Sequence, residues 1–297
     1  MNDPNSSYIG QRLHRIEVRR QTVGMPPKQQ SQVGRARIEH MGLHVQTTPA
    51  TVDRDRPPLP LVHGAWHASW CWTEYWTDYL AERGYTSHAL DLRGHGRSPG
   101  SLRRSGIGDY VADVRTVAAS LDEPPVIVGH SMGGFVTQHY LSRFRARAGV
   151  LVASVPNHGV MPATIRVARE HPGAFARANA TLNLGPIVDD PVRAKALLFG
   201  SHTPDEYARR YIDQVQGESY LAFIGMMFSR PKPAQVRDPL FIIGAAEDAI
   251  FPPREIHDTA EDYGTTATIF EGIGHDMMLD TRWEEPAAAV TDFLDTL

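Results

Sequence analysis

Short, mostly apolar runs alternate with longer segments of helical spacing along much of the chain. The runs are Leu59–Val62, Thr86–Leu90, Pro125–Val128 and Gly149–Val155. The helical segments between them are Trp70–Arg83, Ile107–Leu121 and Met132–Phe144. Buried strands separated by helices are typical of a parallel sheet that is covered by helices on both sides. The pattern therefore predicts an α/β domain.

A stretch without strand signals interrupts this alternation. Residues 157–237 hold helix-like pieces that are separated by Pro and Gly. These pieces are Ile165–Glu170, Pro191–Phe199, Pro204–Gln216 and Tyr220–Phe228. Two further strands follow, at Leu240–Gly244 and Thr268–Phe270. We therefore expect residues 34–156 and 238–297 to form the core, with residues 157–237 as a helical cap inserted after a strand.

Residues 1–33 differ from the rest in composition, because they are rich in Gln and Arg and contain few large apolar residues. Ile9, Leu13 and Ile16 recur at helical spacing beside several arginines. One interpretation is an amphipathic arm that docks on a partner subunit of a homo-oligomer, on an anionic surface or on its own domain. The other is a partly ordered tail, or an upstream start that precedes a later methionine.

Charge and cysteine usage exclude several classes of protein. The 297 residues include 30 basic and 34 acidic side chains, a net charge of −4, which argues against nucleic-acid binding through bulk electrostatics. The single cysteine, Cys71, cannot form an internal disulfide, and no Cys/His cluster suits a zinc site. No apolar run approaches the roughly 18 residues of a membrane span, and no secretory signal is evident. We expect a cytoplasmic protein that needs no metal or organic cofactor.

The clearest candidate for chemistry is a serine between a strand and a helix. Gly129-His130-Ser131-Met132-Gly133 follows an apolar run and opens a helical segment. In that context the G-x-S-x-G spacing is typical of a nucleophile elbow, a tight and strained turn that glycines make room for. Gly134 would let the helix approach the sheet. Since a serine is a weak nucleophile without a base, the elbow alone does not establish a function.

A histidine base and a carboxylate are expected further along the chain, in the order Ser, Asp or Glu, His. Asp248 and His275 each follow a predicted strand, at the carboxyl end where open α/β sheets place their sites. Glu247 is a rival for the carboxylate, and each of these residues could instead be an ordinary loop residue. Asp276 is interpreted as a neighbouring carboxylate, either on the surface or in support of the site.

An acyl-transfer site also needs two backbone N–H groups that bind the developing oxyanion. One is predicted at Met132, directly after the serine. The other is predicted at Ala65, because Gly64 lets the backbone turn its amide toward the site. His63 is interpreted as a residue that fixes this loop by hydrogen bonds rather than as a second base. Trp66 is predicted to form a wall of the substrate pocket or to pack against the cap.

The cap provides the only clue to the substrate, because it is rich in large apolar side chains. Most of them are expected to pack the cap on the core. Met226, Met227 and Phe228 are predicted to line a roomy acyl or alcohol pocket, since methionine adapts to varied shapes. The substrate expected from this is a carboxylic ester of a moderately hydrophobic small molecule, with a thioester or a lactone as related choices.

Together these motifs resemble the α/β-hydrolase superfamily, in its branch of small capped serine esterases, lysophospholipase-like hydrolases and plant methylesterase-like enzymes. The residues that carry the resemblance are Leu61–Trp66, Asp91–Ser98, Gly129–Gly134, Asp248–Pro252 and Gly274-His275. The resemblance runs from about Pro58 to the C-terminus. It implies the α/β-hydrolase fold, with a mostly parallel sheet, and acyl transfer by a triad of Ser131, Asp248 and His275.

The sequence is also compatible with other functions on the same fold. Epoxide hydrolases and haloalkane dehalogenases are disfavoured, because they carry aspartate where Ser131 stands. A cofactor-free haloperoxidase-like enzyme, a carbon–carbon bond hydrolase or a lyase would use the same triad. A hydroxynitrile-lyase-like reaction commonly needs a cap lysine, for which Lys195 is the only candidate before the Pro-rich exit of the cap. A non-catalytic protein that binds a small ligand is the alternative from a different class.

Overall fold

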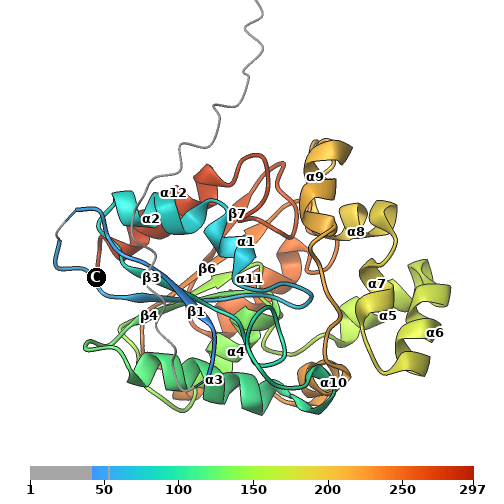
Figure 1. The fold of residues 1–297 in the computed structure, drawn as a ribbon, viewed down its shortest axis with the longest axis horizontal. Helices are drawn as coiled ribbons and strands as arrows, with labels where there is room; N and C mark the ends of the chain where they lie inside the picture. Colours follow the sequence, from blue (N-terminus) through green and yellow to red (C-terminus); the bar gives the residue numbers. More distant parts are fainter. Residues whose placement is uncertain (1–41, 53) are drawn as a thin grey trace, which may run out of the picture. The chain divides into compact units, whose positions relative to one another are not determined.

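A seven-stranded sheet forms the centre of the fold in the computed structural model, which describes residues 42–52 and 54–297 (Figure 1). The strands are β1 (Val45–Thr48), β2 (Leu59–Val62), β3 (Ser87–Leu90), β4 (Val126–His130), β5 (Ala148–Val152), β6 (Leu240–Ala245) and β7 (Ala267–Phe270). Their order is β1-β3-β2-β4-β5-β6-β7; β1 pairs antiparallel with β3, and the other pairs are parallel. The predicted α/β class, with a mostly parallel sheet, is confirmed. The predicted arm of residues 1–33 lies outside the described residues.

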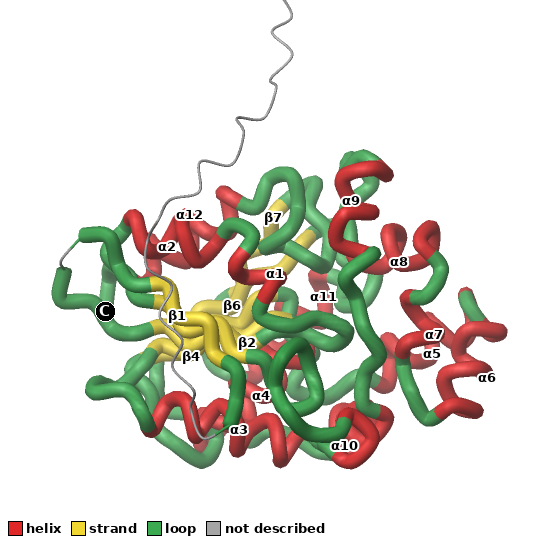
Figure 2. Tube along the Cα trace, viewed as in Figure 1, coloured by secondary structure: helices red, strands yellow, loops and turns green. Residues whose placement is uncertain are grey.

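Helices cover both faces of this sheet. Those of the core are α1 (Trp70–Thr73), α2 (Trp76–Glu82), α3 (Ile107–Ala119), α4 (Met132–Leu141), α11 (Pro253–Asp262) and α12 (Glu284–Leu294). Figures 1 and 2 show α2 and α12 over one face and α3 and α4 over the other. Every residue of β4 and β5 is buried, as expected of strands between two helical layers. The described part of the chain also holds two single-turn 3₁₀ helices, at Leu102–Arg104 and Pro233–Gln235.

The segment predicted as one helix, Trp70–Arg83, is broken in two. The break falls at Tyr75, whose φ of −137° and ψ of −50° leave the helical region. The Tyr75 hydroxyl hydrogen bonds to that of Tyr211, 2.7 Å away. The break in the helix therefore coincides with a contact between Tyr75 and Tyr211. Because these residues are far apart in the sequence, local spacing does not predict the contact.

Six helices occupy the chain between β5 and β6, and we call them the cap helices. They are α5 (Met161–Glu170), α6 (Pro172–Thr181), α7 (Gly185–Val188), α8 (Pro191–Leu198), α9 (Asp205–Ile212) and α10 (Tyr220–Phe228). Figure 1 shows most of them together beside one edge of the core. The bounds of the predicted core and cap domains stay predictions.

The sheet brings distant parts of the sequence to one edge. Since β2, β4, β6 and β7 run parallel, the loops that follow them all leave from the carboxyl edge of the sheet. Ala65, Ser131, Asp248 and His275 each lie in one of these loops or turns. In the part of the chain that the structure describes, no helix has both the length and the apolar character of a membrane span.

Candidate active site

Ser131 lies on a strained turn between β4 and α4. Its φ of 52° and ψ of −117° belong to a region that residues other than glycine rarely adopt. The glycines around it allow the turn, because a Cβ on Gly129 would lie 2.4 Å from the carbonyl oxygen of Gly133. A Cβ on Gly133 would lie 2.3 Å from the carbonyl oxygen of Val62. The local backbone therefore has the geometry of a nucleophile elbow.

A chain of hydrogen bonds joins the three residues predicted as a triad. Nε2 of His275 lies 2.9 Å from Oγ of Ser131, and Nδ1 lies 2.7 Å from Oδ2 of Asp248. All three side chains are buried. Because a carboxylate only accepts hydrogen bonds, Nδ1 carries the imidazole proton and the lone pair of Nε2 faces the serine hydroxyl. This is the arrangement in which a histidine can remove a proton from a serine.

The neighbouring carboxylate, Glu247, points elsewhere. Its Oε2 accepts a hydrogen bond of 2.5 Å from the backbone N–H of Ser201, and its side chain is partly exposed. The hydrogen bond from Ser201 lowers the pKa of Glu247. The structure therefore brings Asp248, and not its rival, to the imidazole of His275.

The two backbone N–H groups predicted for an oxyanion hole flank the serine. Ala65 and Met132 both line the cavity beside Ser131. Met132 is the first residue of α4, where helices leave N–H groups without an intrahelical acceptor. Within the described residues neither N–H donates a hydrogen bond to a protein acceptor.

The loop that carries Ala65 is held tightly against the elbow. A Cβ on Gly64 would lie 2.7 Å from Nδ1 of His130 and 2.9 Å from Cβ of Ser131. His63 fixes the loop as predicted, since its Nε2 accepts the backbone N–H of Leu92 at 3.1 Å. Burial, with a contribution from His95, lowers the pKa of His63 well below its ordinary value. His63 is thus a neutral structural residue rather than a second base.

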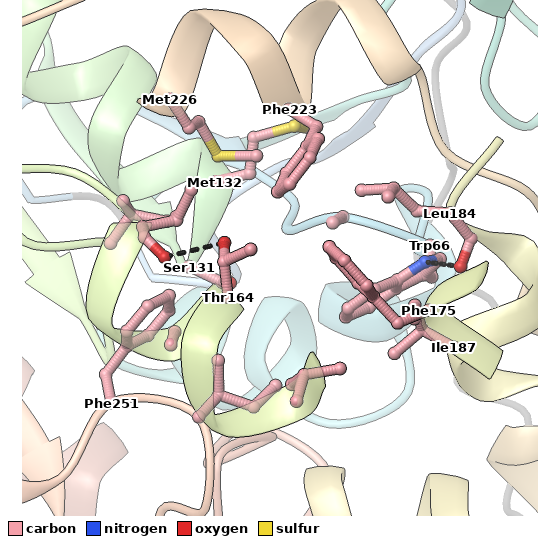
Figure 3. Close-up of a pocket in the computed structure, with 16 residues that line it drawn as sticks. Trp66, Ser131, Met132, Thr164, Phe175, Leu184, Ile187, Phe223, Met226 and Phe251 are labelled. Atoms are coloured by element: carbon pink, nitrogen blue, oxygen red, sulfur yellow. Dashed lines mark hydrogen bonds between the residues drawn. The ribbon is translucent and has the colours of Figure 1, made fainter. Parts of the chain in front are cut away.

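The cavity beside Ser131 is small and almost entirely apolar, with a volume of about 90 Å³. Its walls come from loops of the core, from the start of α4 and from α5, α6, α7 and α10, as Figure 3 shows. Thr164 provides the other hydroxyl in the lining, and it donates to the carbonyl oxygen of Val160 at 2.8 Å. None of the described residues that line the cavity is charged. The serine hydroxyl is thus the polar side-chain group that remains available to a ligand.

Two of the four residues predicted to contact substrate lie elsewhere. Trp66 and Met226 line the cavity, and Nε1 of Trp66 donates to the carbonyl oxygen of Leu184 at 3.1 Å (Figure 3). Met227 and Phe228 do not line it, and 69% of Phe228 is exposed to solvent. The prediction was wrong for these two because residues 226–228 span about 200° around the helix, so the three side chains cannot all face one cavity.

Asp276 is not a surface residue. It is fully buried, and its Oδ2 lies 3.0 Å from Nε2 of His67. Burial opposes the charge of Asp276, but His67 outweighs burial, so the pKa of the carboxyl falls below its ordinary value. Sequence reasoning missed His67, although it lies two residues after Ala65 in a loop already assigned to the site.

His130, His275 and Asp276 form a buried group with the side-chain types that bind metal ions; their ligand atoms lie within 4.8 Å of one another. Both ring nitrogens of His275 are already occupied by Ser131 and Asp248. A metal ion on His275 would therefore have to break the hydrogen-bonded chain. His130 and Asp276 are therefore better suited to supporting the imidazole of His275 than to forming a metal site.

Comparison with protein families agrees with this fold. A model described as "Alpha/beta hydrolase family" matches residues 61–292, which include every loop of the site. The chain belongs to the α/β-hydrolase family.

Among individual proteins, the chain is similar to norfluorocurarine synthase 1 from Strychnos nux-vomica, with 30% identity over 54% of this chain and 56% of that protein. It is 27% identical to a monoacylglycerol lipase from Mycolicibacterium smegmatis, over 65% of this chain and 72% of that one. A crystal structure of Paleococcus ferrophilus monoacylglycerol lipase matches 85% of this chain and 98% of its own, with a TM-score of 0.65 and 22% identity. The chain thus spans only about half of the synthase, and the structural match concerns the fold alone.

Proposed function

We propose that the protein is a serine hydrolase that cleaves a carboxylic ester of a moderately hydrophobic small molecule through an acyl-enzyme. The observation that supports this most directly is the hydrogen-bonded chain from Ser131 through His275 to Asp248, which ends at an apolar cavity. Such a chain makes a serine nucleophilic, because the base accepts the hydroxyl proton while the carboxylate holds the imidazole in place. The similarity to a monoacylglycerol lipase is consistent with ester chemistry.

In the proposed reaction, Oγ of Ser131 attacks the ester carbonyl carbon while Nε2 of His275 takes the hydroxyl proton. The carbonyl oxygen becomes an oxyanion, which accepts hydrogen bonds from the N–H groups of Ala65 and Met132. His275 then donates its proton to the leaving alcohol as the ester C–O bond breaks. Water, deprotonated in turn by His275, attacks the acyl-enzyme. The bond between Oγ of Ser131 and the acyl carbon breaks, the acid leaves, and His275 returns the proton to Oγ.

The cavity favours neutral, apolar groups next to the ester. A charged group would lose its hydration there without gaining a partner, because no described lining residue carries a charge. The volume of about 90 Å³ is smaller than the roughly 150 Å³ of a dry cavity that binds benzene. We therefore expect only a short acyl or alcohol group to enter the enclosed part. Thioesters and lactones present the same carbonyl and fall within the proposal.

A fluorophosphonate probe combined with an ester panel tests this proposal. The wild-type protein should gain one probe adduct, on the peptide that contains Ser131, and should hydrolyse p-nitrophenyl acetate. Ser131→Ala should lose both properties. Ser142→Ala is the matched control, because Ser142 caps the far end of the same helix and should label as the wild type does. A panel that varies the acyl and alcohol sides separately, with a thioester and a lactone, then defines the substrate.

Two other outcomes would replace the proposal. A wild-type protein that neither labels nor hydrolyses any ester would be a non-catalytic protein that binds a small ligand. A protein that labels on Ser131 but turns over no ester would use the triad for another reaction, such as haloperoxidase-like, carbon–carbon hydrolytic or lyase chemistry. A lyase that needs a cap lysine is disfavoured, since Lys195 pairs with Asp205 and does not line the cavity.

A further inference from the structure

The buried imidazole of His67 joins two loops of the site. Its Nδ1 lies 2.7 Å from the carbonyl oxygen of Ala65, and its Nε2 lies 3.0 Å from Oδ2 of Asp276. Ala65 belongs to the loop after β2 and carries one of the two N–H groups proposed to bind the oxyanion. Asp276 directly follows His275 in the loop after β7. One side chain therefore connects the peptide of an oxyanion donor to the residue next to the base.

Both ring nitrogens of His67 face oxygen atoms, and this fixes where its protons lie. A carbonyl oxygen only accepts, so Nδ1 carries a proton and donates it to Ala65. Nε2 shares its proton with the carboxylate of Asp276. Burial opposes a charge on His67, but Asp276 outweighs burial and raises the pKa of His67 above its ordinary value. The contact is thus a charge-assisted pair, which is stronger than a neutral hydrogen bond.

The loop that contains Asp276 is anchored on its other sides as well. The backbone N–H of Asp276 donates to the carbonyl oxygen of Leu198 at 2.8 Å. Nε2 of His130 donates to the carbonyl oxygen of His275 at 3.1 Å, and burial, with His275 nearby, lowers the pKa of His130 to about 3, so its ring is neutral. Leu198 and His130 hold the backbone of this loop, whereas His67 is the residue that links it to Ala65.

We propose that His67 is a positioning residue, which sets the spacing between the oxyanion donor at Ala65 and the imidazole of His275. This role rests on the proposed function of the same site. His67 does not line the cavity, and its hydrogen bonds go to Ala65 and Asp276, so it acts through these two residues. Charge develops on the substrate oxygen and on His275 in the same step, so both groups must be in place together. A displacement of about 1 Å in such a site lowers the rate about 100-fold.

His67→Asn and Asp276→Asn test the role from its two ends. Each should lower kcat for p-nitrophenyl acetate about 10-fold to 100-fold, with KM changed less than about threefold, because positioning acts on the transition state more than on substrate binding. The double variant should be no slower than the slower single variant, since both substitutions remove one connection. Losses that multiply in the double variant would overturn the proposal.

A matched control separates positioning from general stability. His88 is also buried; it lies on β3, and its Nδ1 hydrogen bonds to Oγ1 of Thr47 at 3.0 Å. His88→Asn should lower the melting temperature and leave kcat within about twofold of the wild type, at a temperature where all variants are folded. If His67→Asn behaves in the same way, the role of His67 is structural and the proposal is wrong. Should His67→Asn fail to fold, Asp276→Asn, which preserves shape, decides the question.

A spectroscopic measurement tests the positioning role of His67 independently of the proposed esterase activity. The proton between Nδ1 of His275 and Asp248 should give a low-field proton resonance, and that resonance should shift in His67→Asn and Asp276→Asn but not in His88→Asn. A wild type that neither labels nor hydrolyses esters would overturn the proposed function alone, because the resonance can still be measured. A resonance that the two substitutions leave unchanged would overturn the positioning role.

Discussion

Oδ2 of Asp248 lies 2.7 Å from Nδ1 of His275, while its other oxygen, Oδ1, accepts the backbone N–H groups of Ile250 and Phe251, both at 2.8 Å. These three contacts fix the carboxylate, so it can in turn fix the tautomer of the imidazole. Asp248 and His275 are 27 residues apart in the sequence. They meet because they follow the neighbouring parallel strands β6 and β7.

Asp248→Asn should lower kcat about 10³-fold to 10⁴-fold, as expected when an orienting carboxylate is replaced by its amide. The amide NH₂ group offers a donor to Nδ1, which favours the tautomer with the proton on Nε2, and that tautomer cannot accept the proton of Ser131. The measurement is kcat for p-nitrophenyl acetate. Glu247→Gln is the control and should stay within about threefold, because Glu247 binds Ser201 rather than the imidazole. If Glu247→Gln lowered kcat more than Asp248→Asn does, Glu247 rather than Asp248 would be the carboxylate that orients His275.

Gly64→Ala should remove most of the activity and destabilise the fold by about 1–3 kcal/mol, the usual cost of overpacking. The added Cβ would lie 2.7 Å from Nδ1 of His130 and 2.9 Å from Cβ of Ser131, so the oxyanion loop would have to move away from the elbow. Thermal unfolding and kcat measure the two effects. Gly173→Ala is the matched control, since its Cβ would meet nothing within 4 Å in α6. That variant should gain up to about 1 kcal/mol of stability.

The sequence predicted the sheet and the elbow well because both depend on local rules. β4 and β5 are buried on both faces, so they appear in the sequence as uninterrupted apolar runs. The turn at Ser131 leaves no room for a Cβ at positions 129 and 133, and the sequence has glycine at both positions. The order of serine, carboxylate and histidine in the sequence then follows from the order of the strands that precede them, which are β4, β6 and β7.

The missed features depend on contacts between distant residues. His67 and Asp276 are 209 residues apart, and nothing near either residue indicates that the two meet. Helix α6, Pro172–Thr181, was not predicted, because its buried residues include only small alanines, Ala174 and Ala178, which give a weak apolar pattern. Local spacing thus indicated the elbow at Ser131 but neither the contact between His67 and Asp276 nor helix α6.

Met226→Ala should widen the cavity and shift the preference toward longer acyl groups. Met226 lies on α10 with only 4% of its surface exposed, and it faces the cavity near Ser131 (Figure 3). The ratio of kcat/KM for a butyrate ester to that for an acetate ester should rise about 10-fold, within the usual range for extra methylenes in an apolar pocket. Phe228→Ala, two residues further along α10 and exposed, should leave the ratio unchanged. Equal shifts in both variants would mean that the cavity does not hold the acyl group.

Glu218→Gln should destabilise the protein by about 3 kcal/mol, because it breaks a buried ion pair and leaves its partner uncompensated. Oε2 of Glu218 lies 2.8 Å from Nε2 of His95, and neither side chain is exposed. Glu218 precedes the cap helix α10, and His95 lies in the loop after β3, so the pair ties the cap helices to the core. Thermal unfolding measures the loss. Glu206→Gln, at an exposed position of α9, should change stability by no more than about 0.5 kcal/mol.

The stability contributed by this pair should decrease as the pH rises. Burial opposes the charge of His95, but Glu218 outweighs burial, so the folded protein has a raised His95 pKa. A raised pKa means that the folded state binds the proton more tightly than the unfolded state does, so the contribution is complete below about pH 6.5, the value of an unfolded histidine. The contribution is then lost as the pH rises through the folded pKa. The difference in melting temperature between wild type and Glu218→Gln should therefore be constant between about pH 5 and pH 6.5, where carboxylates are ionised, and shrink above neutral pH. A difference that grows with pH would show that His95 is neutral and that Glu218 is held by Tyr110 and Ser219 instead.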